Sequence, residues 1–190
     1  MKRKIVAATN NAHKLAEIKS ILQDKFDVIS LDEAGIRCDP QENGETFLHN
    51  ALIKAHAAAE FTPLPVLADD TGLCVDALDG APGVNSARFA GDHDDAANRK
   101  KLLELLKGKS RKAHFTCVVA LLYPDGKILC ATGEAHGRIL EEQRGEGGFG
   151  YDSLFFSDDL GKTFAEATEE EKNSVSHRGN ALKNLLQMLH

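Results

Sequence analysis

Several features are missing from this chain of 190 residues, and each absence narrows what it can do. No apolar run approaches the roughly 18 residues of a membrane span, so we expect a soluble chain without a signal peptide or membrane partner. Its four cysteines form no C-x-x-C pair, and nothing indicates export, so we expect reduced thiols and a cytoplasmic location. Nothing resembles a G-x-S-x-G motif or a catalytic cysteine, which disfavours covalent catalysis.

Positive charge is also in deficit. The 23 Lys and Arg residues face 29 Asp and Glu residues, giving a net charge of −6 and a pI near 5.7. A net negative charge disfavours non-specific binding to the phosphate backbone of nucleic acid, so nucleic acid is not an expected partner.

What is present indicates one globular unit. Hydrophobic residues make up 42% of the chain, enough for a sizeable core, and there is no repeat, low-complexity tract or long linker. We therefore expect a single domain over residues 1–190, with room for two lobes.

The apolar pattern alternates between helix and strand. A strand over 4–8 precedes a helix, and a second helix starts near Thr46 and runs to residue 59. Short strands at 66–68 and 73–75 are expected to flank an acidic turn.

The second half adds a hairpin and two more helices. Asp94 or Asp95 can cap a helix, and residues 113–123 and 127–139 form a hairpin around Pro-Asp-Gly. Thr168 and Glu171 match a capping box, and apolar residues at 181–189 predict a last helix. The order predicts an α/β fold with a mixed sheet.

A turn with candidate anion-binding groups lies at residues 9–14, between the first strand and helix. Free N–H groups at a helix N-terminus favour an anion, and Lys14 adds a point charge. The segment matches neither G-x-x-x-x-G-K-[ST] nor G-x-G-x-x-G. Ordinary Asn capping with a solvated lysine is the alternative.

Two adjacent carboxylates stand out at Asp69 and Asp70, before Thr71 and Gly72. Such neighbours are costly unless something positive neutralises them, and Mg²⁺ could do so with Glu42 as a further oxygen ligand. A solvated turn is the alternative. The acidic run at 92–95 is interpreted as a capping turn.

The third candidate region is rich in glycine. Four of the six residues from Gly145 to Gly150 are glycine, and Phe149, Tyr151 and Asp152 place aromatic rings and a carboxylate beside them. A planar ligand could stack there, or the rings could anchor the loop to the core.

Positively charged and donor groups are predicted at the start of the last helix. They come from Lys172 and from the run at 176–179. They favour an anionic or acceptor-rich ligand, or else they pair with the acidic run at 169–171. His49 and His56 are interpreted as a polar stripe on the second helix, and Lys54 as a surface lysine that could reach phosphates.

Taken in order, five motifs resemble the inosine triphosphate pyrophosphatase family, which removes non-standard purine nucleotides. They are Thr9-x-Asn11-x-x-Lys14, Asp69-Asp70-Thr71-Gly72-Leu73, Ala81-Pro82-Gly83 with Ser86-Ala87-Arg88, Phe149-Gly150-Tyr151-Asp152 and Ser176-His177-Arg178-Gly179. The resemblance spans nearly the whole chain. One departure is His49, where many bacterial relatives have Glu, which puts an acidic or second-metal role there in doubt.

The resemblance implies an elongated mixed sheet with helices in two lobes around an active-site cleft, a homodimer, and Mg²⁺-dependent conversion of a nucleoside triphosphate to monophosphate and pyrophosphate. It implies that Glu42 and Asp70 bind the metal and the attacking water, and that Phe149 stacks on the base. The remaining assignments are the triphosphate to Thr9, Asn10, Asn11, Ala12, His13, Lys14 and Lys54, and the base and sugar pocket to Tyr151, Asp152, Lys172, His177 and Arg178. Thr71 and Gly150 are expected to bind substrate as well.

The residues support water as the attacker, because no protein nucleophile is apparent. Asp70 is the expected general base with Asp69 in reserve, since the sequence cannot rank two neighbouring carboxylates. Two rival interpretations remain: a nucleotide sensor without turnover, and a phosphatase or a pyrophosphatase for other modified nucleotides.

Overall fold

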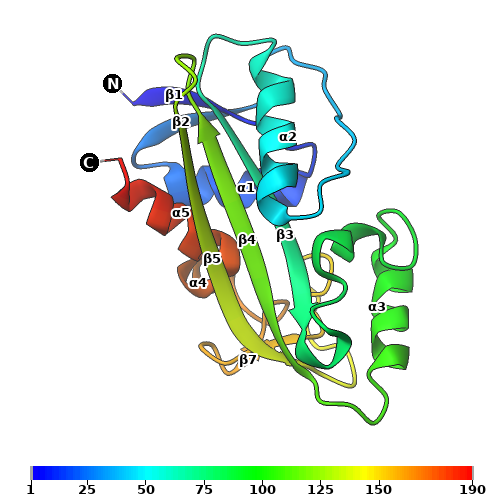
Figure 1. The fold of residues 1–190 in the computed structure, drawn as a ribbon. Coiled ribbons are helices and arrows are strands. Elements are labelled where there is room, and N and C mark those ends of the chain that lie inside the picture. Colours follow the sequence, from blue (N-terminus) through cyan, green and yellow to red (C-terminus); the bar gives the residue numbers. More distant parts are fainter. Residues whose placement is uncertain (1, 190) are drawn as a thin grey trace. The chain divides into compact units, whose positions relative to one another are not determined.

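The protein is described by a computed structural model that covers residues 2–189. It has a seven-stranded sheet in the order β2-β1-β3-β4-β5-β6-β7, flanked by helices, which confirms the predicted α/β class (Figure 1). The sheet is mixed, since β1 pairs in parallel with β2 and β3, whereas β6 pairs antiparallel with β5 and β7. The strands are β1 Arg3–Ala7, β2 Phe26–Ser30, β3 Val66–Val75, β4 Lys112–Leu122, β5 Ile128–Ile139, β6 Phe155–Ser157 and β7 Lys162–Thr163.

Three helices begin where the sequence predicts a start or a cap. The predicted start near Thr46 is the N-cap of α2, and Asp94, one of the two predicted candidates, caps α3. Thr168 and Glu171 form both halves of the predicted capping box before α4. The helices are α1 Ala12–Leu22, α2 Phe47–Ala59, α3 Asp95–Leu105, α4 Glu169–Val175 and α5 His177–Gln187, with 3₁₀ turns η1 Asp76–Leu78 and η2 Gly83–Arg88.

Two local predictions are wrong. Asp69 and Asp70 do not form a turn between two short strands but lie inside one continuous strand, β3, because ion pairs described below neutralise them there. Lys172 does not lie at the start of the last helix. The chain leaves helical geometry at Ser176, so Lys172 occupies the last turn of α4, where a cation is favourable for the helix dipole.

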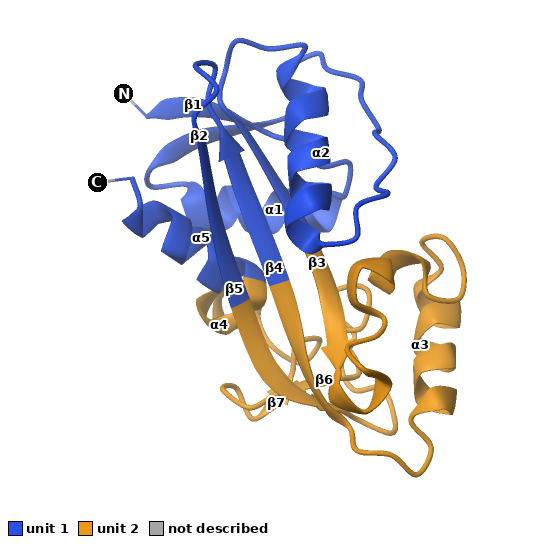
Figure 2. Cartoon of the chain, in the orientation of Figure 1, with its two compact units in different colours: residues 1–70, 117–133, 178–190 blue, residues 71–116, 134–177 orange. Residues whose placement is uncertain are grey.

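The chain divides into two compact units, coloured separately in Figure 2. Unit 1 comprises residues 1–70, 117–133 and 178–190, and unit 2 comprises residues 71–116 and 134–177. Strands β3, β4 and β5 each contribute residues to both units. Within residues 2–189, no helix combines the length and apolar character that crossing a bilayer requires.

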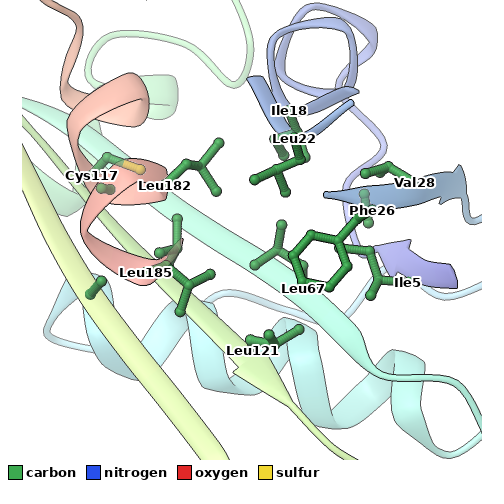
Figure 3. Close-up of a cluster of buried hydrophobic side chains, with 14 residues drawn as sticks. Ile5, Ile18, Leu22, Phe26, Val28, Leu67, Cys117, Leu121, Leu182 and Leu185 are labelled. Atoms are coloured by element: carbon green, nitrogen blue, oxygen red, sulfur yellow. The ribbon is translucent and has the colours of Figure 1, made fainter. Parts of the chain in front are cut away.

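In unit 1 the sheet is covered on both faces. Helices α1 and α5 pack on one face through residues such as Ile18 and Leu182, which meet Ile5 and Leu67 of the sheet (Figure 3). Helix α2 covers the other face with its small alanines, which pack against alternate strand residues such as Val66. This explains why the strands of unit 1 read as continuous apolar runs and not as alternating patterns.

In unit 2 the sheet residues are buried on one face. Leu73, Phe115 and Ile139 share a core with Leu102 of α3 and with Phe164. The part of β5 in unit 2 alternates buried and exposed residues, with Glu134 and His136 on the exposed side. A strand with one solvent-facing side shows this period of two.

Candidate functional site

The candidate phosphate segment lies between the end of β1 and the first turn of α1 in unit 1. Asn11 is the N-cap of α1, and its side-chain oxygen accepts a hydrogen bond of 3.1 Å from the backbone N–H of Lys14. Thr9 Oγ1 accepts a bond of 3.1 Å from Asn11 N, while Asn10 Nδ2 donates to the carbonyl of Cys38 at 3.2 Å. The predicted capping is confirmed, and it fixes the backbone of a helix N-terminus, where the partial charge favours anions.

Asp69 and Asp70 point to opposite faces of β3, because successive side chains of a strand alternate. Asp69 follows the direction of Leu67, whose side chain packs in the core that α1 and α5 cover. Asp70 follows the direction of Ala68, which packs in the core that α2 covers. Each carboxylate therefore meets groups from different helices.

Asp69 is locked into an ion-pair cluster. Its Oδ2 accepts from Arg178 Nη2 at 2.9 Å and Nε at 3.2 Å, and it lies 3.3 Å from Lys14 Nζ. Arg178, which is fully buried, also pairs through Nη1 with Glu17 of α1. Burial alone would raise the pKa of Asp69, but Lys14, Arg178 and Lys54 outweigh it and hold that pKa well below its usual range. Burial would lower the pKa of Arg178, and Asp69 and Glu17 raise it instead.

Asp70 has a different environment. Its Oδ2 accepts from Asn50 Nδ2 at 3.1 Å, and its Oδ1 lies 3.5 Å from Lys54 Nζ, which also bonds Glu42 Oε2 at 2.8 Å. Burial raises the pKa of Asp70, and the charge of Glu42 adds to that increase against the pull of Lys54 and Lys14. Asp70 is thus the more basic of the two carboxylates, a ranking that the sequence left open.

Asn50 is a residue that the sequence analysis missed. It is completely buried, and it links two parts of the site, because its Oδ1 accepts from Gly44 N at 2.8 Å while its amide donates to Asp70. A Cβ at Gly44 would lie 2.6 Å from that Oδ1, so glycine allows the close approach. The available signal was a polar residue on the alanine-rich buried face of α2, one turn before Lys54.

Glu42 and Asp70 are the residues that could hold a metal ion. Both reach the ammonium group of Lys54, so their carboxylates already converge on one cationic centre. Two carboxylates that leave coordination positions for phosphate oxygens and water suit Mg²⁺. Across residues 2–189, no group of three or more His, Cys, Asp or Glu side chains is arranged to hold a metal by itself.

The glycine-rich loop belongs to unit 2. Asp152 Oδ2 accepts from Phe149 N at 3.0 Å and from Lys172 Nζ at 2.7 Å. The Lys172 ammonium also lies 4.8 Å from the centre of the Phe149 ring, in cation–π geometry. A Cβ at Gly148 would come within 2.2 Å of Asp152 Oδ2, which explains the glycine there. The observed ion pair of Lys172 is with Asp152, whereas the predicted alternative paired Lys172 with the acidic run at 169–171.

Tyr151 anchors the loop to the core, as one of the two interpretations predicted. Its ring is buried in the core of unit 2, and its hydroxyl donates to the carbonyl of Ser86 at 2.7 Å. Burial raises the pKa of the Tyr151 hydroxyl, with a further contribution from Asp95. The hydroxyl thus stays a hydrogen-bond donor at neutral pH.

His177 is buried at the first position of α5 and stacks on Phe115, with the ring centres 4.6 Å apart. His49 and His56, in contrast, lie exposed on α2, in agreement with the polar stripe that was predicted.

The structure sorts the predicted site residues into two sets. Arg178 was predicted to take part in base and sugar recognition. Its observed partners, however, are Asp69 and Glu17, which lie in unit 1. Unit 1 contains Thr9, Asn10, Asn11, Ala12, His13, Lys14, Glu42, Lys54, Asp69, Asp70 and Arg178, and unit 2 contains Thr71, Phe149, Gly150, Tyr151, Asp152, Lys172 and His177.

Comparison with known proteins gives this arrangement a context. The chain matches the Ham1 family over residues 5–188. It is 51% identical to a dITP/XTP pyrophosphatase of Desulforamulus reducens, over 98% of this chain and 95% of that protein. It is 50% identical to a dITP/XTP pyrophosphatase of Thermus thermophilus, over 97% of this chain and 90% of that protein.

Solved structures agree with the sequence matches. A HAM1 protein from Coxiella burnetii superposes with a TM-score of 0.88 at 43% identity, covering 98% of both chains. The Ham1 protein of Staphylococcus aureus gives a TM-score of 0.86 at 41% identity, again over 98% of both chains. These matches confirm the resemblance that the five sequence motifs indicated. With a family match over nearly its full length and relatives at about half identity, the chain belongs to the Ham1 family.

Proposed function

We propose that the protein hydrolyses non-standard purine nucleoside triphosphates (ITP, dITP and XTP) to the nucleoside monophosphate and pyrophosphate, and so cleanses the nucleotide pool. The relatives named dITP/XTP pyrophosphatase support this substrate class. The observation that carries the proposal is the pair of adjacent carboxylates in β3. Asp69 is a fixed anion among cations, and Asp70 is a desolvated base beside Lys54 and Glu42.

The proposed reaction is attack of water on the α-phosphorus. A bond forms from the water oxygen to phosphorus, the bond to the oxygen bridging the α- and β-phosphates breaks, and pyrophosphate leaves with that oxygen. The water proton passes to Asp70, whose raised pKa suits a proton acceptor. Lys14 and Lys54 would stabilise the negative charge that moves to the leaving group.

Mg²⁺ is the proposed cofactor, with Glu42 and Asp70 as its protein ligands. When bound, it neutralises phosphate charge and lowers the pKa of a water molecule. The ammonium of Lys54, which pairs with both carboxylates, supports the proposal that this pair can hold a cation.

Base recognition is assigned to unit 2. Phe149 would stack on the purine, and Lys172 and His177 would contribute donors near its edge, with Thr71, Gly150, Tyr151 and Asp152 shaping the pocket. Hypoxanthine and xanthine present an O6 acceptor and an N1–H donor, whereas adenine presents the reverse, so a donor facing O6 disfavours ATP by about 1–3 kcal/mol. We also propose that the chain forms a single domain, assembles as a homodimer and acts in the cytoplasm.

Reaction in ¹⁸O-labelled water tests the proposal. The label should appear in the nucleoside monophosphate, and pyrophosphate should be the primary product. Label found only in pyrophosphate would contradict attack at the α-phosphorus, orthophosphate as first product would indicate a phosphatase, and binding without turnover would indicate a sensor.

A further inference from the structure

In the candidate base-binding loop, both backbone groups of Gly150 form hydrogen bonds with side chains of one helix, α3. The backbone N–H of Gly150 donates to Asp95 Oδ2 at 2.8 Å, and Arg99 Nη1 donates to the Gly150 carbonyl at 2.6 Å. Asp95 and Arg99 are four residues apart on α3, so they project from the same face of the helix. We call these two contacts the α3 clasp.

The clasp acts on the residue that follows Phe149. Gly150 has a φ of 61°, in the left-handed region that glycine adopts at low cost, and the next residue is fixed by the bond from Tyr151 to Ser86. On the other side, Asp152 binds the backbone N–H of Phe149 itself. The peptide units around Phe149 are thus fixed by side chains of α3 and by Asp152 of the loop itself.

Such fixing is needed because the segment is rich in glycine. Residues 145–150 would sample many backbone conformations if they were unrestrained, and binding would then pay the entropy of ordering them. Charged groups bonded to both backbone groups of Gly150 remove much of that freedom before a ligand arrives.

These contacts lie outside the hydrogen-bonded cap of α3. Asp94, not Asp95, is the N-cap whose side chain bonds the backbone of α3. Arg99 directs its guanidinium to Gly150, which lies 51 residues away in the sequence.

From these contacts we propose that Asp95 and Arg99 are positioning residues, which hold the loop so that the Phe149 ring stands ready to stack on a purine base. They would strengthen substrate binding without touching the nucleotide. This inference rests on the proposed function, because it assigns the base to Phe149.

The first arm of the test measures loop order without any substrate. The chain has no tryptophan, so Phe149→Trp introduces a single reporter at the position in question. In that background, Arg99→Ala and Asp95→Ala should lower the tryptophan fluorescence anisotropy and add a fast component to its decay. Lys100→Ala is the matched control, since Lys100 is exposed, neighbours Arg99 and carries the same charge.

The second arm measures kinetics in the native Phe149 background. A loop that holds the binding shape for about a tenth of the time raises the apparent Kd about tenfold. We therefore expect Arg99→Ala and Asp95→Ala to raise KM for ITP about tenfold, with kcat changed by less than about threefold. Arg99→Lys and Asp95→Asn, which keep a donor and an acceptor, should restore part of the loss. A general loss of packing would not follow this pattern.

Each remaining outcome overturns the inference. Unchanged anisotropy in both alanine variants would show that the clasp does not order the loop. Lower anisotropy with unchanged KM would overturn it too, and Phe149→Ala then locates the error. If Phe149→Ala raises KM, the clasp alone is wrongly assigned, whereas an unchanged KM shows that the base does not bind at Phe149. Should Arg99→Ala fail to fold by circular dichroism, Asp95→Ala and Arg99→Lys decide the question in the same two arms.

Discussion

The two units hold their candidate functional groups in different ways. In unit 1 both faces of the sheet are covered, and Asp69 and Asp70 are fixed by side chains that reach the strand from helices on opposite faces. In unit 2 the candidate groups Phe149 to Asp152 lie on a loop, and its backbone is fixed by contacts such as those of Asp95 and Asp152.

This difference predicts different consequences of mutation. Groups on a strand between two covered faces are rigid and desolvated, so their charge state is set by their neighbours. A loop depends on how well its shape is preorganised. We therefore expect damage in unit 1 to change kcat, pH dependence and stability, and damage in unit 2 to change KM and the choice of base.

The largest effect is expected for Asp70→Asn. The variant should fold and bind nucleotide but lose kcat by about 10² or more, since a general base alone contributes about 10²–10⁴. Steady-state kinetics at saturating Mg²⁺ measure the loss, with circular dichroism to confirm folding. A kcat near that of the wild type would show that Asp70 is neither base nor essential ligand.

Asp69→Asn should act first on stability. It removes the Asp69 charge from half-buried Lys14 and from fully buried Arg178, which keeps Glu17, and breaking a buried ion pair costs about 3–5 kcal/mol. The folded pKa of Asp69 is lowered, so its stabilisation is present above the unfolded value of about 3.9 and is lost as the pH falls through the folded value.

The folded pKa of Asp70 is raised, so its contribution to stability depends on pH in the opposite direction to that of Asp69. The stabilisation from Asp70 is present below the unfolded pKa of about 3.9 and is lost as the pH rises through the folded value. Urea unfolding without metal at several pH values should show Asp69→Asn less stable than the wild type at neutral pH, and Asp70→Asn equally or more stable. Both differences should shrink as the pH falls. Equal pH dependence for the two variants would contradict the contrast between the carboxylates.

Arg178→Ala separates two roles for that residue. If Arg178 reads the base, as its family motif implies, the ratio of kcat/KM for ITP to that for ATP should narrow. The pairing with Asp69 and Glu17 predicts instead that kcat falls by about tenfold or more for both nucleotides, at a nearly constant ratio. Lys172→Ala is the matched change in unit 2 and should affect KM and the nucleotide ratio more than kcat.

A smaller effect is expected for Asn50→Ala. Asn50 donates a hydrogen bond to Asp70, the proposed metal ligand, and loss of such a partner typically costs about 10- to 100-fold in metal affinity or activity. The Mg²⁺ concentration for half-maximal rate should rise, and excess Mg²⁺ should restore part of the rate. The neighbouring exposed His49→Ala serves as control. An unchanged Mg²⁺ requirement in the folded Asn50→Ala protein would remove Asn50 from the site.

Local signals in the sequence were sufficient for most of the fold. The helix start near Thr46, the caps at Asp94 and Thr168 and the hairpin turn at 124–126 depend on neighbouring residues, and all are confirmed. The acidic stretch was mispredicted as a turn because its continuation as a strand depends on distant cations. Arg178, for example, is 109 residues from Asp69.

The candidate site was predicted less completely for the same reason. Charged and aromatic residues in recognisable motifs could be selected from the sequence. Asn50, Glu17 and Arg99 could not, because their roles arise from partners that only the folded chain brings within hydrogen-bond distance. Ranking the two carboxylates by basicity also required knowing toward which face of β3 each side chain points.

The most direct test of this contrast is a carbonyl NMR titration of protein carrying ¹³Cγ-labelled aspartate, in metal-free buffer, with Asp69→Asn and Asp70→Asn for assignment. We predict that the Asp70 carboxyl titrates above the ordinary value of about 3.9. We also predict that Asp69 stays ionised until the protein unfolds in acid. Titration of both carboxyls near the ordinary value, or Asp69 above Asp70, would contradict the assignment of a fixed anion and a base to these neighbours.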